Sequence, residues 1–400
     1  MSATEPSAFP GEARLVFLTA CGEWADPLIV DAMGGRLDWP SVLALATREH
    51  ACAAAAGRFA RLGAPNAATH TLDVLRQHGA VEEFRMALLE ERLERLMARF
   101  SEAGVDFVLL KGSAVALRYF GGLKARPMGD LDVLVRPERA TAAHELALEL
   151  GWVPRKGLRA EMYVGMPHLP PLVAGDGLGF GLEIHTALFP DEAPFRFSPE
   201  DLWRSATRLP RAGRPATPDP EHLLVHACLH FAWSHRFRRG AWRTVRDLDA
   251  LIADPALRPD HFAELVKYAR GDTCVYWTCA LVEEITGRAV PVMPARGPQI
   301  RTGPLHAWVL RHIVLEAAYA PDAPGTRQLA RVLWSLAVRP RASGHGGARP
   351  WKGDERWLDP SEREAAEPER WGDRFSGFLA YARRVLGFEP RGGPPARDAD

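Results

Sequence analysis

Two aspartates, Asp130 and Asp132, are the residues whose types and spacing best suit chemistry in this chain. They belong to the segment GDLDVLV, and residues 130–135 alternate in a way that predicts a β-strand. Residues two apart on a strand point to the same side, so both carboxylates would share one face. Neighbouring carboxylates repel each other unless a cation lies between them, and Mg²⁺ prefers oxygen ligands. The pair predicts a metal site; the alternative is a structural Asp-x-Asp at a strand start.

Lys111, Gly112 and Ser113 follow an apolar segment, residues 105–110, which predicts a buried strand. Gly112 permits a tight turn and Ser113 is a good helix N-cap, so a short helix is expected over residues 114–120. Backbone N–H groups at a helix start favour an anion such as phosphate. A phosphate cradle beside a carboxylate pair predicts metal-assisted phosphoryl or nucleotidyl transfer.

The order of these elements is more specific than either motif alone. The helix ends at Gly121-Gly122, and a loop with Lys124 and Arg126 leads to the aspartate strand. The chain has neither the G-x-x-x-x-G-K-[ST] pattern of a P-loop nor the G-x-G-x-x-G pattern of a dinucleotide-binding fold. A different phosphate-binding arrangement is therefore expected.

The segment LLKGSAVALRYF…ARPMGDLDVLVRPE resembles the uncharacterised nucleotidyltransferase family of bacteria, within the polymerase-beta-like nucleotidyltransferase superfamily. The resemblance runs from about residue 37 to about residue 252. The superfamily pattern is Gly-Ser, then Asp-x-Asp, then a third carboxylate on a later strand. Gly112-Ser113 matches the first element, and the gap from Ser113 to Asp130 is wider than is typical of the superfamily, although it suits this family.

Glu183, in the segment LEIH, is the best match for the third carboxylate. Residues 178–185 predict a strand, on which Glu183 and His185 point to the same side. If that strand lies beside the aspartate strand, Glu183 joins the site; otherwise it is an exposed residue of an edge strand. His185 would orient phosphate or a carboxylate, or would only pack.

The resemblance implies that a nucleoside monophosphate is transferred from a nucleoside triphosphate to an acceptor and that pyrophosphate is released. ATP is the favoured nucleoside triphosphate. It also implies that Asp130 and Asp132 hold two Mg²⁺ ions, with Mn²⁺ as an alternative. Glu183 would share the ion that activates the acceptor oxygen.

The same resemblance implies the phosphate contacts. Gly112 and Ser113 would hold the β- and γ-phosphates. Lys111 and Arg126 would stabilise charge at the transferring phosphate.

Two helical segments further along the chain carry additional candidates. His222, His226 and His230 recur every four residues, but no carboxylate or cysteine completes a metal site, so the stripe is expected to face the cleft or another helix. Asp247 and Asp249 repeat Asp-x-Asp in a segment of helical periodicity, where residues two apart lie about 200° apart and cannot chelate one ion together. Asp247 matches an acidic position of the family and would face the active site or pair with an N–H or an arginine.

The order of the elements predicts an α+β (α/β) fold, a small mixed-sheet nucleotidyltransferase core between helical parts. Residues 1–100 are expected to be helical, with the clearest amphipathic pattern at 71–100. The core is expected over residues 101–210, followed by a helical domain over 211–338. Residues 339–400 are expected to be a linker and a short terminal helix, partly disordered.

Composition limits the partners. The 400 residues include 50 basic and 50 acidic ones, so the net charge of zero does not indicate broad nucleic-acid binding. A local patch at Arg236, Arg238, Arg239 and Arg243 could still contact phosphate, and a small-molecule or peptide acceptor is favoured. Five scattered cysteines fit a reducing cytoplasm, and no apolar run is long enough to cross a membrane.

Two other functions remain open from the sequence. A nucleotidyltransferase fold can serve as a non-catalytic partner in a toxin–antitoxin pair or a biosynthetic complex. A phosphotransferase is the other alternative, because kinases also use acidic Mg²⁺ ligands. The intact set of acidic residues and the order from Ser113 to Asp130 and Asp132 favour nucleotidyl transfer.

Overall fold

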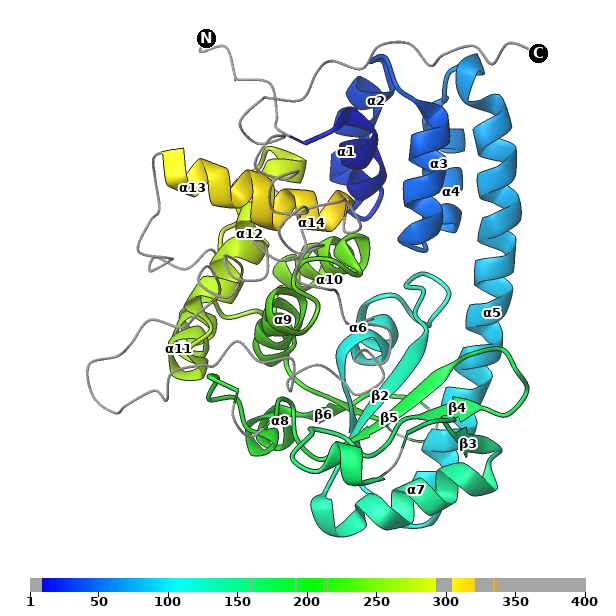
Figure 1. Ribbon diagram of the computed structural model, residues 1–400, viewed down its shortest axis with the longest axis vertical. Coiled ribbons are helices and arrows are strands. Elements are labelled where there is room, and N and C mark those ends of the chain that lie inside the picture. Colours follow the sequence, from blue (N-terminus) through cyan, green and yellow to red (C-terminus); the bar gives the residue numbers. More distant parts are fainter. Residues whose placement is uncertain are drawn as a thin grey trace, which may run out of the picture.

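A single mixed β-sheet lies at one end of the molecule, and helices cover it (Figure 1). The computed structural model describes residues 9–158, 160–190, 193–211, 213, 215–292, 304–320, 334 and 338. The expected α+β (α/β) fold with a mixed sheet is confirmed. The linker and terminal helix expected over residues 339–400 lie outside the described residues.

The sheet has seven strands in the order β3-β4-β5-β2-β1-β7-β6. The strands are β1 (Phe107–Leu109), β2 (Asp130–Val135), β3 (Trp152–Pro154), β4 (Leu172–Ala174), β5 (Gly181–His185), β6 (Thr207–Arg208) and β7 (Ala216–Thr217). β2 pairs antiparallel with β1 and parallel with β5, so it is a central strand. Its apolar run is buried from Leu131 to Val135, as a strand covered on both faces requires.

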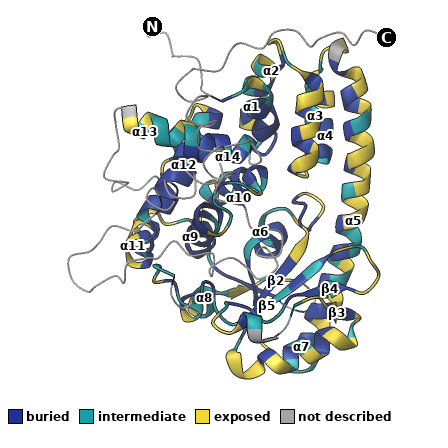
Figure 2. Ribbon diagram, in the orientation of Figure 1, coloured by how far each residue is buried: buried dark blue, intermediate teal, exposed yellow. Residues whose placement is uncertain are grey.

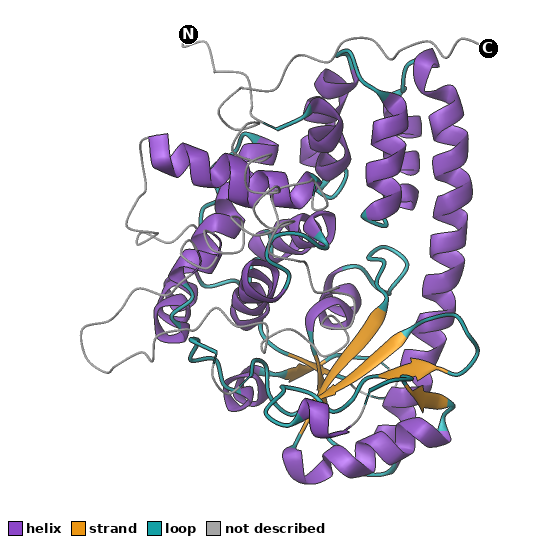
Figure 3. Ribbon diagram, viewed as in Figure 1, coloured by secondary structure: helices purple, strands orange, loops and turns teal. Residues whose placement is uncertain are grey.

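Two helices flank the sheet and one of them is unusually long. α5 (Thr69–Glu102) runs along the side of the molecule, and α7 (Ala140–Glu149) lies across the end beside β3 (Figures 1 and 3). The side of α5 that faces away from the protein is exposed over most of its length (Figure 2). Phe84 is 64% exposed, although it is an apolar residue of the segment 71–100 whose amphipathic pattern predicted a buried apolar face. No helix of the described residues is long and apolar enough to span a membrane.

Helices from both ends of the described chain form one packed body above the sheet (Figure 1). Trp242 joins them: its indole N–H donates to the Thr19 hydroxyl at 3.0 Å, and its backbone N–H donates to Glu49 at 3.1 Å. The N-terminal helices are α1 (Gly11–Leu18), α2 (Asp26–Met33), α3 (Trp39–Arg48) and α4 (Cys52–Leu62). The later ones are α9 (Pro220–Leu229), α10 (Ala241–Ile252), α11 (Pro259–Ala269), α12 (Asp272–Thr286), α13 (Pro304–Val309) and α14 (Glu316–Tyr319). The short helix α8 (Pro199–Ser205) lies lower in this view, at the level of the sheet (Figure 1).

Element boundaries differ from the expectations at several places. α6 (Lys111–Tyr119) begins at Lys111 rather than after Ser113, because the Leu110 carbonyl already accepts from Ala114 N–H and from the Ser113 hydroxyl. The short strands β4, β6 and β7 were not predicted, because two or three residues that do not belong to a longer apolar run carry no periodicity. β7 pairs with β1, so the sheet continues beyond residue 210.

Candidate active site

A cleft of about 540 Å³ lies between the sheet and the helices α9 and α10. The sheet side carries the carboxylates of Asp130, Asp132 and Glu183, which line the cleft together with Lys111. Parallel pairing of β2 with β5 sets Asp132 opposite Glu183 in the register, and this pairing brings the third carboxylate to the first two. The three acidic residues singled out in the sequence therefore lie on one wall.

Lys111 and His185 hold two of these carboxylates. The Lys111 ammonium lies 2.7 Å from Oδ1 of Asp132 and 3.6 Å from Oε2 of Glu183. Nε2 of His185 donates to the same two oxygens, at 2.9 Å and 3.2 Å. Asp130, at the start of β2, makes no hydrogen bond or ion pair within the described part of the chain, and its side chain reaches solvent.

The environments of the carboxylates move their pKa values apart. The pKa of Asp130 is raised to about 6, first by desolvation in the cleft and then by the charges of Asp132 and Glu183. Desolvation alone would also raise the pKa of Asp132, but the Lys111 charge and the His185 hydrogen bond outweigh it and lower the value. The same balance sets the pKa of Glu183 well below its usual range.

Gly112 and Ser113 lie in the first turn of α6, and their side-chain positions face protein atoms. A Cβ atom at Gly112 would lie 2.2 Å from Nη1 of Arg126, so glycine is required by the guanidinium packed against it. The Ser113 hydroxyl is buried and donates to the Leu110 carbonyl at 2.9 Å, with the Asp132 carbonyl at 3.4 Å. Ser113 thus supports the backbone that carries Asp132, and its hydroxyl is already bonded.

Arg126 reaches its position through a buried ion pair with Asp247. Nε and Nη2 of Arg126 donate to the two carboxylate oxygens of Asp247 at 2.7 Å and 2.6 Å. Both residues line the cleft, so Asp247 faces the site and also has an arginine partner. Asp249 accepts instead from Gly22 N–H and the Trp24 indole, so the two aspartates have different partners. Lys124 does not line this cleft.

The histidine stripe divides between two places. His226 and His230 line the cleft, and the helix changes there to a π-helix over His230–Ser234, a feature frequent at functional sites. His226 is only 2% exposed, and its Nε2 has no hydrogen-bond partner within the described structure. His222, one turn earlier, does not line the cleft.

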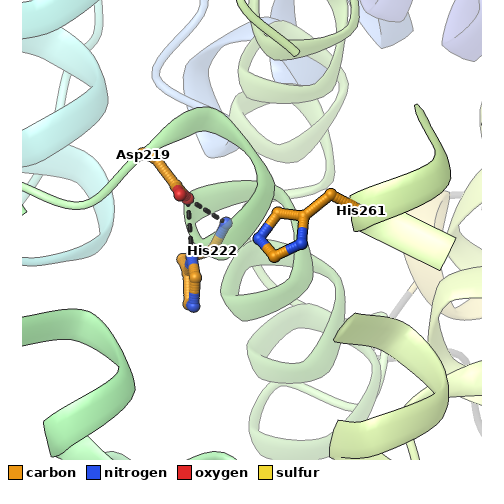
Figure 4. Close-up of side chains that lie close together, drawn as sticks. All are labelled: Asp219, His222 and His261. Atoms are coloured by element: carbon orange, nitrogen blue, oxygen red, sulfur yellow. Dashed lines mark hydrogen bonds and ion pairs between the residues drawn. The ribbon is translucent and has the colours of Figure 1, made fainter. Parts of the chain in front are cut away.

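His222 belongs instead to a cluster with Asp219 and His261 (Figure 4). One ligand atom from each lies within 4.8 Å of the others. Asp219 caps α9, however, and accepts from the backbone N–H of His222 at 2.9 Å and from its Nδ1 at 2.6 Å, while Arg258 lies 3.5 Å away. These hydrogen bonds give the cluster a structural role at the start of α9.

The helical wall of the cleft contributes cationic residues that the sequence showed only as a patch. Arg236, Arg239 and Arg243 line the cleft, whereas Arg238 does not. Arg243 makes no hydrogen bond or ion pair with the described residues, and its pKa is lowered by desolvation and by the Arg126 charge. Arg236 and Phe237 have positive φ angles of 52° and 61°, so the backbone is strained where the chain turns between α9 and α10.

Arg155, His168 and His235 also line the cleft and were missed. Arg155 follows β3 by one residue, and His168 precedes β4, so both reach the site from the ends of short strands and neither belongs to a motif. Of these three residues, only His235 had a local sequence signal: it directly precedes Arg236 and follows the histidine stripe.

His226 makes the stability of the protein sensitive to acid. Desolvation and the Lys111 charge lower its pKa to about 3, whereas the unfolded chain binds the proton near pH 6.5. The unfolded state therefore takes up the proton first, and stability falls as the pH drops from 6.5 towards 3. We expect His226→Gln to reduce this loss by about 1.4 kcal/mol per pH unit in that window.

Urea unfolding at a series of pH values measures this effect. The exposed His70→Gln variant is the matched control and should follow the wild-type curve. Equal pH dependence in His226→Gln and the wild type would contradict the buried, neutral state of His226.

Comparison with protein families matches residues 35–287 to the family described as uncharacterised nucleotidyltransferase, well over half of the chain. No curated protein matches. Among solved structures, the antibiotic-resistance factor ANT(2″)-Ia is similar, with 19% identity, 36% of this chain and 73% of that chain covered, and a TM-score of 0.27. The family match covers the cleft-lining elements from α6 to α10. The chain therefore belongs to the family of uncharacterised nucleotidyltransferases.

Proposed function

We propose that this protein is a divalent-metal-dependent nucleotidyltransferase that moves a nucleoside monophosphate from a nucleoside triphosphate to an acceptor hydroxyl. The observation that carries the proposal is the convergence of Asp130, Asp132 and Glu183 on one wall of the cleft, beside Lys111. In the reaction a bond forms between the acceptor oxygen and the α-phosphorus. The bond from that phosphorus to the β-phosphate oxygen breaks, pyrophosphate leaves, and the hydroxyl proton passes to solvent.

The carboxylates fit a hard divalent cation such as Mg²⁺ or Mn²⁺. Ligand atoms of Asp132, Glu183 and His185 lie within 4.8 Å of one another, and the Asp130 carboxylate on the same strand makes no hydrogen bond among the described residues. The oxygen-rich set suits Mg²⁺, with Asp130, Asp132 and Glu183 as the proposed ligands. A bound ion would neutralise phosphate charge and activate the acceptor oxygen.

The remaining charged residues of the cleft suit the triphosphate. The first turn of α6 presents the backbone of Gly112 to the cleft, and helix N-termini favour anions. Arg243, which lacks a hydrogen-bonded partner in the described structure, is proposed to bind the β- or γ-phosphate. Arg126 is fixed by Asp247, so its position does not depend on substrate. Fixed cations of this kind stabilise the charge that develops on the leaving pyrophosphate.

The size of the cleft and its aromatic side favour a small-molecule or peptide acceptor. A volume of about 540 Å³ is typical of a small-molecule site. Phe189 and Trp233 line it, next to the neutral ring of His226, and offer flat surfaces for a nucleobase or an acceptor ring. We place the protein in the cytoplasm, because all five cysteines are free thiols.

The test is incubation with each nucleoside triphosphate, labelled at the α-phosphate, and with pools of small-molecule and peptide acceptors. We expect a Mg²⁺-dependent adduct that carries one nucleoside monophosphate, detected by mass spectrometry, together with one pyrophosphate. Label transferred from the γ-phosphate would instead identify a phosphotransferase. Nucleotide binding without any turnover would favour the non-catalytic partner.

A further inference from the structure

We propose that Lys111 serves as a built-in cation at this site, so that the protein binds one divalent ion rather than the two that the sequence resemblance implies. The inference rests on the proposed function. Its basis is the position of the Lys111 ammonium, 2.7 Å from Oδ1 of Asp132 and 3.6 Å from Oε2 of Glu183. These two carboxylates are the ones expected to share the acceptor-activating ion.

The same two oxygens also accept hydrogen bonds from His185. Its Nε2 lies 2.9 Å from Oδ1 of Asp132 and 3.2 Å from Oε2 of Glu183, and its Nδ1 is buried without a partner in the described structure. The proton therefore resides on Nε2, between two ionised carboxylates. A divalent ion that bridged these oxygens would have to displace both the ammonium and the imidazole N–H.

Other ligand atoms remain available for one ion. Asp130 has no hydrogen bond or ion pair among the described residues, and both the ion pair with Lys111 and the hydrogen bond from His185 engage Asp132 through Oδ1. Both carboxylates lie on the same side of β2. We therefore narrow the three proposed ligands to Asp130 and Asp132 for the single divalent ion, with Glu183 neutralised by Lys111 instead.

The backbone of Lys111 shows that the fold holds this residue in place. Its φ angle of 47° lies in the left-handed region, which strains a non-glycine residue. Both backbone groups of the preceding Leu110 are bonded: its N–H donates to the Asp132 carbonyl at 3.0 Å, and its carbonyl accepts from the Ser113 hydroxyl at 2.9 Å. These bonds hold the turn in which the Lys111 side chain is directed at Asp132.

The charge of the cleft agrees with one ion. Among the described residues that line it, six are basic and four are acidic, an excess of two positive charges. His226, His230 and His235 add none at neutral pH, because burial lowers the pKa of each, to about 3 for His226 and His235 and well below the usual value for His230. A nucleoside triphosphate with one Mg²⁺ carries about two negative charges, which matches this excess. A second Mg²⁺ would leave two positive charges uncompensated in a desolvated site.

The test counts bound Mn²⁺ by electron paramagnetic resonance in the presence of saturating α,β-methylene-ATP, which does not react. We expect one Mn²⁺ per chain for the wild type and for Lys111→Arg, which keeps the positive charge. Lys111→Ala should bind two, because the gap between Asp132 and Glu183 then lacks its cation and only the His185 N–H remains to be displaced. We also expect Lys111→Ala to melt at a lower temperature without metal and to recover with Mn²⁺.

The outcomes separate this inference from the proposed function. Two Mn²⁺ per wild-type chain would overturn the role of Lys111 and leave nucleotidyl transfer standing. An unchanged count in folded Lys111→Ala, with weaker nucleotide binding, would show that Lys111 contacts phosphate instead. Absence of Mn²⁺ and nucleotide binding in the wild type would overturn both. The wild-type count decides the inference even if Lys111→Ala fails to fold.

Discussion

Asp132→Asn is expected to lower nucleotidyl transfer by about a thousandfold or more. The amide keeps the shape of the side chain but removes the charge that both Lys111 and a divalent ion require. A thousandfold lower rate corresponds to the loss of about 4 kcal/mol of transition-state stabilisation. Because Glu183 still lies 3.6 Å from Lys111, the unfolding free energy should fall by only about 1 to 2 kcal/mol. Steady-state pyrophosphate release and thermal unfolding measure the two effects.

Asp249→Asn is the matched control, because Asp249 is the second residue of the other Asp-x-Asp in the chain. It accepts from Gly22 N–H at 2.7 Å and from the Trp24 indole at 2.9 Å, away from the cleft. We expect a modest loss of stability and nearly full activity. If Asp132→Asn retained activity comparable to Asp249→Asn, the carboxylate wall would not be the catalytic site.

Gly112→Ala is expected to have the largest effect on stability. The new Cβ would lie 2.2 Å from Nη1 and 2.9 Å from Cζ of Arg126, and contacts this short force the guanidinium to move. Arg126 is 8% exposed and bonded twice to Asp247, so its displacement breaks a buried ion pair. Breaking such a pair costs about 3 to 5 kcal/mol, and we expect nucleotide binding to weaken with it. Urea unfolding and calorimetric titration with α,β-methylene-ATP measure the two losses.

Gly129→Ala provides the control for this prediction. Gly129 precedes Asp130 in the same motif, yet a Cβ atom there meets nothing within 4 Å. The unfolding free energy of the Gly129→Ala variant should differ from that of the wild type by less than about 1 kcal/mol. A cycle with the Arg126→Ala and Asp247→Ala double variant tests the cause, since the cost of Gly112→Ala should largely disappear in that background. A cost that persists there would mean that Gly112 is needed for its backbone alone.

Local patterns in the sequence determined the central elements of the site. The alternation of residues 130–135 placed Asp130 and Asp132 on one face of a strand, and β2 has these bounds in the structure. Helical periodicity separated Asp247 from Asp249, and the two indeed have partners on different sides of α10. These inferences hold because side-chain direction repeats with a period set by the backbone alone.

The turn at Gly112 and Ser113 shows that local sequence patterns do not predict which atoms the side chains contact. Gly112 was expected to admit phosphate, and the atom that requires glycine is the guanidinium of Arg126. Ser113 was expected to contact phosphate, and its hydroxyl is bonded to the Leu110 carbonyl. In both cases the side-chain partner is fixed by packing, which residue type and spacing do not encode.

Only the tertiary structure decided which charges meet. Asp132 lies beside Glu183 because β2 and β5 pair in parallel, and Arg126 meets Asp247 across 121 positions of sequence. The placement of Lys111 between two carboxylates likewise depends on a left-handed backbone angle held by β1 and β2. Hydrogen bonds of the sheet and burial of unlike charges select these pairings among many that the sequence allows. The sequence by itself determined which faces carry the carboxylates, and the packing of sheet against helices determined which cations neutralise them.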